Sequence, residues 1–177
     1  NIEKFKLIDR IKALKELRWD LNKKHILFAA NPNRYEKNYS LAKNAVTLIQ
    51  DNNIKLHCLN NVSNKDIPNY LNAADIILLT SRWEGSPNVI KEAMSCSRPI
   101  VSTKVGDVDW VLGDTDGCFV CSHNVQEISQ KIKVALKYSK QFNRTNGRDR
   151  IIYLGLDSVS IAKKIINIYE MIIKKIN

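Results

Sequence analysis

The chain has 177 residues, of which 44% are hydrophobic and 26% charged, and its formal net charge is +10. This composition is typical of one globular domain with a buried core, and no apolar run approaches the roughly 20 residues that a membrane-spanning helix needs. The positive charge would suit nucleotide phosphates, an anionic membrane or nucleic acid, but the basic residues are scattered. Because only 7% of residues are aromatic, a nucleic-acid-binding domain is disfavoured.

The first residue is Asn1 rather than Met, which suggests that the chain is a piece of a longer protein, and no targeting segment is recognisable. The most basic parts are the two ends, where a weak contact with a membrane surface is expected. The basic residues at the ends are Lys4, Lys6, Arg10, Lys12, Lys15, Arg18, Lys163, Lys164, Lys174 and Lys175. We expect a cytoplasmic protein that is at most peripheral to the inner membrane face.

Apolar periodicity predicts strands that alternate with helices along the chain. An opening helix is predicted from the helical spacing of Leu7, Ile11, Leu14 and Leu17. Buried strands are predicted at residues 25–30, 54–59, 75–80, 99–103 and 117–121. Further helices are predicted at residues 41–49, 67–74, after Pro87, at 125–138 and at 159–176. The last of these should bury Ile161, Ile165, Ile168, Tyr169 and Ile172.

Strands that alternate with helices predict an α/β fold, in which a parallel sheet is covered on both faces. Right-handed crossovers would make it a doubly wound, Rossmann-like sheet. Ligands of such sheets bind beyond the carboxyl ends of the strands. The loops expected at that edge are residues 31–38, 60–64, 81–88 and 104–109.

The cysteines and histidines do not predict a metal site. Cys118 and Cys121 have CxxC spacing, but they lie in a predicted strand, where residues three apart point to opposite faces. Buried, reduced thiols of a cytosolic protein are the favoured interpretation. The three histidines His25, His57 and His123 show no spacing typical of metal ligands.

A tight loop, Gly85-Ser86-Pro87, follows the predicted strand at 75–80 and opens a helix. Ser86 is suited to cap this helix and Pro87 to occupy its first position. The N–H groups of residues 88–90 would then lack partners within the helix and would favour an anion such as a phosphate. An ordinary capped helix remains the alternative.

Two carboxylates flank this loop with seven residues between them. Asn88 and Glu92 share one helix face, and Glu92 leans back toward the amino end of the helix. Carboxylates accept hydrogen bonds from hydroxyl groups, so Glu84 and Glu92 could hold the sugar and ribose on the two sides of a phosphate group. Two surface glutamates at this spacing would be the alternative.

Residues 84–94, EGSPNVIKEAM, closely resemble the EX7E motif of retaining GT-B glycosyltransferases, with family 4 of the group-1 superfamily as the nearest match. The resemblance continues through residues 98–108, RPIVSTKVGDV, includes ADI at 74–76, and covers residues 24–138. It implies that residues 1–177 are the C-terminal, nucleotide-sugar-binding domain of a GT-B enzyme whose N-terminal acceptor domain is absent.

The resemblance also implies roles for particular residues. Glu84 would contact hydroxyls of the donor sugar and Glu92 those of the ribose. The backbone of Gly85, Ser86, Pro87, Asn88 and Val89 would hold the diphosphate. Lys37 matches the lysine that the family places on the diphosphate, and we expect it to act with Glu84 in catalysis.

Three departures from the family pattern concern the site. The arginine that normally accompanies the lysine falls on Asn31, so Arg34 is the candidate substitute. The chain is short before the loop that contacts the nucleobase, a role assigned to Asn61, Val62 and Ser63. Ser97 stands where the family often has glycine.

The expected function is metal-independent, retaining transfer of a glycosyl group from a nucleotide-diphosphate sugar, which is a substrate rather than a cofactor. By family analogy the acceptor belongs to polysaccharide, lipopolysaccharide or glycolipid assembly, and the isolated domain should transfer little or no sugar. The alternative is a nucleotide-sugar-binding module or an epimerase-like enzyme without transfer. The lack of GxGxxG after the first strand argues against a nicotinamide enzyme. No nucleic-acid partner is expected.

Overall fold

The computed structural model describes residues 1–176 and side chains up to Lys174, so the side chain of the predicted basic residue Lys175 lies outside it. Five parallel strands form one sheet in the order β2-β1-β3-β4-β5. The strands are β1 (Lys24–Phe28), β2 (Ile54–Cys58), β3 (Ile76–Leu79), β4 (Ile100–Thr103) and β5 (Cys118–Cys121). The predicted Rossmann-like, doubly wound α/β fold is confirmed.

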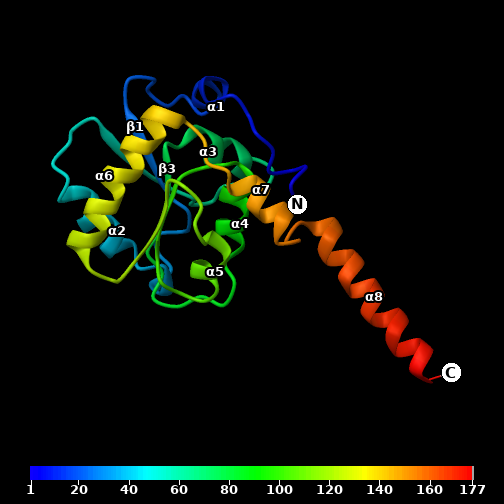
Figure 1. Ribbon diagram of the computed structural model, residues 1–177. Coiled ribbons are helices and arrows are strands. Elements are labelled where there is room, and N and C mark those ends of the chain that lie inside the picture. Colours follow the sequence, from blue (N-terminus) through cyan, green and yellow to red (C-terminus); the bar gives the residue numbers. More distant parts are fainter. Residues whose placement is uncertain (177) are drawn as a thin grey trace.

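Helices cover both faces of the sheet (Figure 1). The helices are α1 (Arg10–Glu16), η1 (Tyr35–Lys37), α2 (Tyr39–Thr47), α3 (Ile67–Ala73), α4 (Asn88–Ser95), α5 (Val108–Leu112), α6 (Val125–Phe142), α7 (Gly147–Tyr153) and α8 (Ser158–Ile176). Apolar residues of α2 and α6 pack on one face, and those of α3, α4, α5 and α7 pack on the other. Alternation along β3 explains this division, because Ile76 and Leu78 face one layer while Ile77 and Leu79 face the other.

The opening helix buries less than its periodicity predicts. Asp9 caps α1 by accepting a hydrogen bond from the N–H of Lys12, so the helix begins at Arg10. Leu14 is buried with Ala13 against Ala73 of α3. Leu7 and Ile11, by contrast, are 46% and 45% exposed. The predicted apolar stripe was therefore wrong in its first half: Leu7 precedes the helix, and Ile11 lies in α1 but on its exposed side.

The predicted burial of α8 was also wrong. The helix forms, but it extends away from the rest of the chain (Figure 1). The five residues predicted to be buried, Ile161, Ile165, Ile168, Tyr169 and Ile172, are 38–63% exposed. Periodicity shows that a helix has an apolar face, but it does not show that the same segment of chain provides a surface to cover it.

Cys118 and Cys121 face opposite sides of the sheet as predicted, and Cys96 and Cys121 are buried, whereas Cys58 and Cys118 are only partly buried. Cys118 packs with the residues on one face of the sheet, and Cys121 packs on the other. All four cysteines are free thiols. Burial raises the pKa of Cys118 to about 12 and that of Cys121 to about 11, so both behave as apolar core residues.

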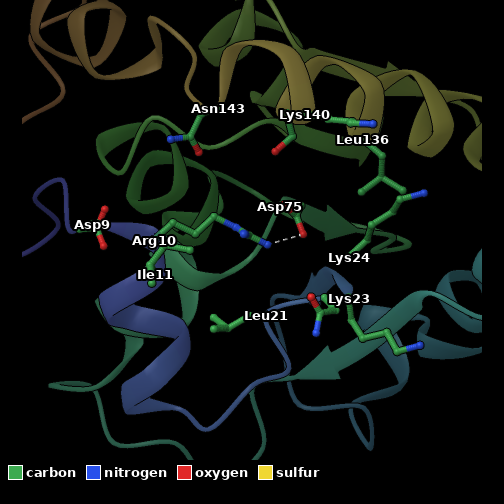
Figure 2. Close-up of a pocket in the computed structure, with 12 residues that line it drawn as sticks. Asp9, Arg10, Ile11, Leu21, Lys23, Lys24, Asp75, Leu136, Lys140 and Asn143 are labelled. Atoms are coloured by element: carbon green, nitrogen blue, oxygen red, sulfur yellow. Dashed lines mark hydrogen bonds and ion pairs between the residues drawn. The ribbon is translucent and has the colours of Figure 1, made fainter.

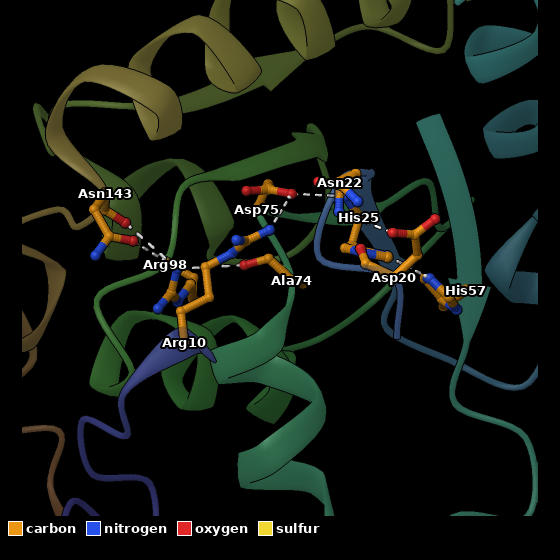
Figure 3. Close-up of polar contacts among 9 residues, drawn as sticks. All are labelled: Arg10, Asp20, Asn22, His25, His57, Ala74, Asp75, Arg98 and Asn143. Atoms are coloured by element: carbon orange, nitrogen blue, oxygen red, sulfur yellow. Dashed lines mark hydrogen bonds and ion pairs between the residues drawn. The ribbon is translucent and has the colours of Figure 1, made fainter. Parts of the chain in front are cut away.

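Two of the histidines are neighbours, which the sequence did not predict. Nδ1 of His25 in β1 lies 2.9 Å from Nε2 of His57 in β2, and the Trp19 ring stacks on His57 with 3.5 Å between centroids. The backbone N–H of His25 donates to the Asp75 carboxylate, which also pairs with Arg10 at 2.8 Å (Figure 3). This polar network ties the amino ends of β1 and β3 to α1.

No helix within residues 1–176 combines the length and the apolarity that crossing a membrane requires.

Candidate active site

A cavity of about 510 Å³ lies at the carboxyl ends of β1, β2 and β3. Three loops and the start of α4 form its wall. The lining residues are Ala29, Ala30, Arg34, Lys37, Leu59, Asn64, Ile67, Glu84, Gly85, Ser86, Pro87, Asn88, Val89 and Glu92. β1 and β3 are neighbours in the sheet, but the helices that follow them, α2 and α4, lie on opposite faces. Doubly wound sheets bind ligands at such a point.

The start of α4 differs in one detail from the prediction. Pro87, at φ −65° and ψ 116°, is the cap residue, and the helix begins at Asn88. Ser86 does not cap the helix, because its hydroxyl contacts the Asp107 carboxylate and the ammonium of Lys91 instead. No side chain caps α4. Since the first N–H groups of a helix have no intrahelical partner, this end of α4 is suited to bind an anion in the cavity.

Lys37 and Glu84 form an ion pair at the cavity wall. Lys37 Nζ lies 2.5 Å from Glu84 Oε1, and the two side chains are only 13% and 14% exposed. The Ser81 hydroxyl donates to the same oxygen at 2.7 Å. Lys37 follows β1 and Glu84 follows β3, and these strands are hydrogen-bonded neighbours, so the sheet brings the two residues together.

The loop after β4 contacts residues 85–87, the glycine loop that precedes α4. The N–H of Asp107 donates to the carbonyl of Gly85 at 3.1 Å. Gly106 has φ +52°, and a Cβ there would lie 1.9 Å from the same carbonyl oxygen. Only glycine fits this left-handed position so close to another backbone. Sequence reasoning gave Gly106 and Asp107 no role, although both lie in a loop predicted at the ligand-binding edge.

Glu92 lies one turn into α4 and also lines the cavity. It is half-buried, and burial raises the pKa of its carboxyl group, partly offset by the charge of Lys4. Asn88, on the same helix face, also lines the cavity. The sequence prediction that these two residues share a face of the site is therefore consistent with their positions.

Of the residues predicted to bind the donor in the other two loops, only Arg34 lines the cavity. Arg34 lines the cavity, but its side chain is 59% exposed and pairs with Glu36 at 2.5 Å. Asn31 accepts a hydrogen bond from the N–H of Asn33. In the loop after β2, Asn61 and Val62 are outside the cavity wall, and Leu59 and Asn64 line it instead. The nucleobase roles of Asn61 and Val62 stay predictions.

The charges in the cavity would suit a ligand that carries both phosphates and hydroxyls. Lys37, Arg34 and the start of α4 offer positive charge and N–H donors, whereas Glu84 and Glu92 offer acceptors. Within residues 1–176 there is no group of three or more histidine, cysteine or acidic residues that could hold a metal ion.

A second cavity of about 510 Å³ lies at the opposite edge of the sheet, by the amino ends of β1 and β3 (Figure 2). The Arg10–Asp75 ion pair lies at its centre, and Lys24 and Lys140 are on its wall. Arg10 is therefore committed to a structural contact. Because ligands of parallel sheets bind at the carboxyl ends of strands, the cavity at Lys37 and Glu84 is the candidate active site.

The strand order β2-β1-β3-β4-β5, with helices on both faces, matches the C-terminal half of a GT-B fold. The family model described as "Glycosyl transferases group 1" matches residues 11–138, and the chain belongs to this family. This agrees with the resemblance carried by residues 84–94.

Two curated relatives are similar to this chain over more than half of its length. A UDP-Gal:α-D-GlcNAc-diphosphoundecaprenol α-1,3-galactosyltransferase of Escherichia coli is 32% identical over 128 residues, or 71% of this chain and 33% of the relative. An N,N'-diacetylbacillosaminyl-diphospho-undecaprenol α-1,3-N-acetylgalactosaminyltransferase of Campylobacter jejuni is 30% identical over 115 residues, or 63% and 30%. The chain thus spans about a third of the length of these relatives.

Solved structures show the same fold. The C-terminal domain of a group 1 glycosyl transferase (LpcC) from Francisella tularensis matches with a TM-score of 0.72 at 15% identity, covering 86% of this chain and 96% of that one. Sucrose-phosphate synthase from Thermosynechococcus elongatus matches with a TM-score of 0.86 at 15% identity, covering 99% of this chain and 51% of that one.

Proposed function

We propose that this chain is the donor-binding half of a retaining glycosyltransferase that uses a nucleotide-diphosphate sugar. The observation that carries the proposal is the Lys37–Glu84 ion pair, which lies in one cavity with the uncapped start of α4. Membership of the group 1 family supports the reaction class. The site residues are proposed as Glu84 and Lys37 for catalysis, and Arg34, Asn61, Val62, Gly85, Ser86, Pro87, Asn88, Val89 and Glu92 for donor binding.

Each part of the cavity has a proposed target on the donor. The start of α4 and Lys37 bind the diphosphate, Glu84 binds hydroxyls of the sugar, and Glu92 binds hydroxyls of the ribose. In the reaction, the bond between the anomeric carbon and the diphosphate oxygen breaks, the acceptor hydroxyl forms the new bond to that carbon, and its proton passes to an oxygen of the leaving diphosphate. Lys37 and the α4 dipole would stabilise the negative charge that develops on the leaving diphosphate.

The acceptor proposed for the whole enzyme is a glycan linked to a lipid diphosphate. Its support is that the names of both curated relatives give a diphospho-undecaprenol compound as the acceptor. The place of action would then be the cytoplasmic face of the membrane, with the enzyme bound peripherally. A polysaccharide, lipopolysaccharide or glycolipid is the corresponding product class.

The acceptor-binding half of the enzyme is proposed to be a separate N-terminal domain. Two observations support this partner: the chain covers a third of its curated relatives, and the apolar residues of α8 are exposed. The N-terminal domain would cover that helix. The 177 residues alone should therefore bind nucleotide and transfer little or no sugar, and no nucleic-acid partner is proposed.

The test of the donor site is a comparison of matched nucleotides and variants. UDP, GDP and ADP are titrated into the chain by calorimetry, and the best ligand is compared with its 2′-deoxy form. Wild type should bind the ribose form more tightly. Glu92→Gln should reduce this preference about tenfold, or by about 1.4 kcal/mol, because a charged hydrogen-bond acceptor is lost. Glu170→Gln, which makes the same change at an exposed position on α8 outside the cavity, is the control.

Two results would contradict the donor proposal. One is that none of the three diphosphates binds. The other is that Glu92→Gln leaves the preference for ribose unchanged. Transfer to lipid-linked acceptors by the complete protein separates a glycosyltransferase from a binding module, since a binding module would bind the nucleotide sugar without turnover.

A further inference from the structure

Two exposed aromatic side chains lie beside the candidate active site without lining its cavity. Tyr35 is 70% exposed and Trp83 is 57% exposed. Their ring centroids are 6.0 Å apart, and the Arg82 guanidinium lies 4.5 Å above the centre of the Tyr35 ring. We call Tyr35, Arg82 and Trp83 the aromatic platform. Two large aromatic rings and an arginine are the side chains most enriched where proteins bind partners tightly.

The platform is next to the catalytic pair in the chain and in space. Trp83 immediately precedes Glu84, and Tyr35 belongs to the same short helix as Lys37. The platform therefore lies beside the Lys37–Glu84 ion pair, whereas Glu92 lies one turn into α4. On the proposed function, the ion pair marks where the transferred sugar leaves the donor.

Hydrogen bonds join the two loops that carry the platform. The N–H of Arg82 donates to the carbonyl of Glu36 at 2.8 Å, and its guanidinium contacts the side-chain oxygen of Asn38 at 3.3 Å. Asn38 has φ 54°, a left-handed conformation that asparagine tolerates. The Thr80 hydroxyl donates to the carbonyl of Asn38 at 3.0 Å. Because both loops are fixed to each other, the rings need little ordering when a ligand binds.

We propose that the aromatic platform binds a sugar ring of the acceptor, whose other contacts would belong to the N-terminal half of the enzyme. A pyranose ring has faces of C–H groups that can bury against an aromatic ring, and hydroxyls at its rim that can accept hydrogen bonds from a guanidinium. Tyrosine and tryptophan provide large apolar surface with few rotatable bonds, and the guanidinium carries five donors. The inference rests on the proposed function, because it takes Glu84 to mark the sugar end of the site.

Two other occupants are less well supported. A nucleobase could also stack on these rings, but the proposed ribose contact, Glu92, lies in α4 rather than next to Tyr35 or Trp83 in the chain. The N-terminal half of the enzyme could also cover the platform, but the guanidinium of Arg82 over the Tyr35 ring suits a ligand rich in hydroxyls. The experiment below distinguishes a sugar from a nucleobase.

The test uses the indole N–H signals of the three tryptophans, Trp19, Trp83 and Trp110, in the 177-residue chain. Methyl glycosides of glucose, galactose, N-acetylglucosamine and N-acetylgalactosamine are titrated separately and followed by NMR. At least one glycoside should shift the Trp83 signal in a saturable way, at least fivefold more than it shifts the other two. Tyr35→Ala and Arg82→Ala should raise the dissociation constant at least tenfold.

Trp110→Ala provides the matched control, because Trp110 is 54% exposed on α5 and lies outside the platform. The proposal is overturned if no glycoside shifts the Trp83 signal saturably, or if Trp110→Ala weakens binding as much as Tyr35→Ala. It is also overturned if uridine or guanosine alone moves the Trp83 signal, since the platform would then hold the base. Donor binding is read separately from the backbone amides of Gly85, Ser86, Asn88 and Val89 on adding UDP or GDP, so failure of the two proposals is distinguishable.

Discussion

The ammonium group of Lys37 lies 2.5 Å from the carboxylate of Glu84, although 47 residues separate them in the chain. Adjacent parallel strands carry the two residues to one edge of the sheet. A buried charge that loses its partner is costly, so each residue holds the other in place until a ligand arrives. A diphosphate would compete with Glu84 for Lys37 and thereby couple donor binding to the position of Glu84.

Removal of the Lys37 charge should weaken nucleotide binding. Lys37→Met should reduce the affinity for the best nucleoside diphosphate about tenfold, because one charge-assisted contact is lost. Calorimetry would measure this, with Lys43→Met on the exposed side of α2 as the control. Equal affinity of Lys37→Met and wild type would mean that the lysine does not contact the diphosphate.

The stability of the same pair can be measured separately. Lys37→Met alone should reduce the free energy of unfolding by about 1–2 kcal/mol, below the 3–5 kcal/mol typical of a fully buried pair. The double variant Lys37→Met/Glu84→Gln removes both charges and should recover part of that loss. Urea unfolding would report both values. A double variant less stable than the single one would contradict the idea that Lys37→Met loses stability because the Glu84 carboxylate is left unpaired.

Gly106 should tolerate no side chain. Gly106→Ala would place its Cβ against the Gly85 carbonyl and would force a left-handed alanine. We expect a loss of about 1–3 kcal/mol in stability and a weaker nucleotide site, because the glycine loop must move. Gly85→Ala is the control for stability: no heavy atom lies within 4 Å of its added Cβ, so its effect should stay within about 0.5 kcal/mol.

Stability should fall as the pH falls from 6.5 to 4. Burial lowers the pKa of His57 to about 4, and that of His25 is also lowered, chiefly by burial. Since the unfolded chain binds these protons more readily, the stabilisation is complete above pH 6.5 and is lost through this window. His57→Phe keeps a ring on Trp19 and removes one titrating group. In urea unfolding, the slope of the variant's free energy of unfolding against pH should correspond to close to one proton fewer than that of wild type. An unchanged slope would contradict the assignment of this pH dependence to His57.

Deletion of α8 should barely affect the folded body. Its apolar residues are exposed, and its first turn is attached mainly through the Asp157 cap and contacts of Lys164 with the carbonyls of Leu154 and Gly155. A chain that ends at Asp157 should lose at most about 1 kcal/mol, or 2–4 °C in melting temperature. Replacement of Ile165, Ile168 and Ile172 by Glu in the intact chain should likewise leave the melting temperature unchanged. A much larger loss in either variant would show that α8 packs on the body.

The sequence by itself determined the order of the five strands and of six helices, though not η1, α5 or α7, and the identity of the motif. Alternation along β3 and the contiguous residues 84–92 are local properties, because side-chain direction in a strand or helix follows from the backbone repeat. The opposite facing of Cys118 and Cys121 is predictable for the same reason. The start of α4 was placed one residue early, since the Ser86 hydroxyl turns to Asp107 and Lys91 rather than to the helix.

Only the tertiary structure decided which distant residues meet. The contacts of Lys37 with Glu84 and of His25 with His57 depend on which strands are neighbours, and no local pattern contains that order. The fit of Gly106 under Gly85 depends on two loops from different strands. The exposure of α8 has the same cause: an amphipathic repeat specifies an apolar face, but only the folded chain shows whether another surface covers it.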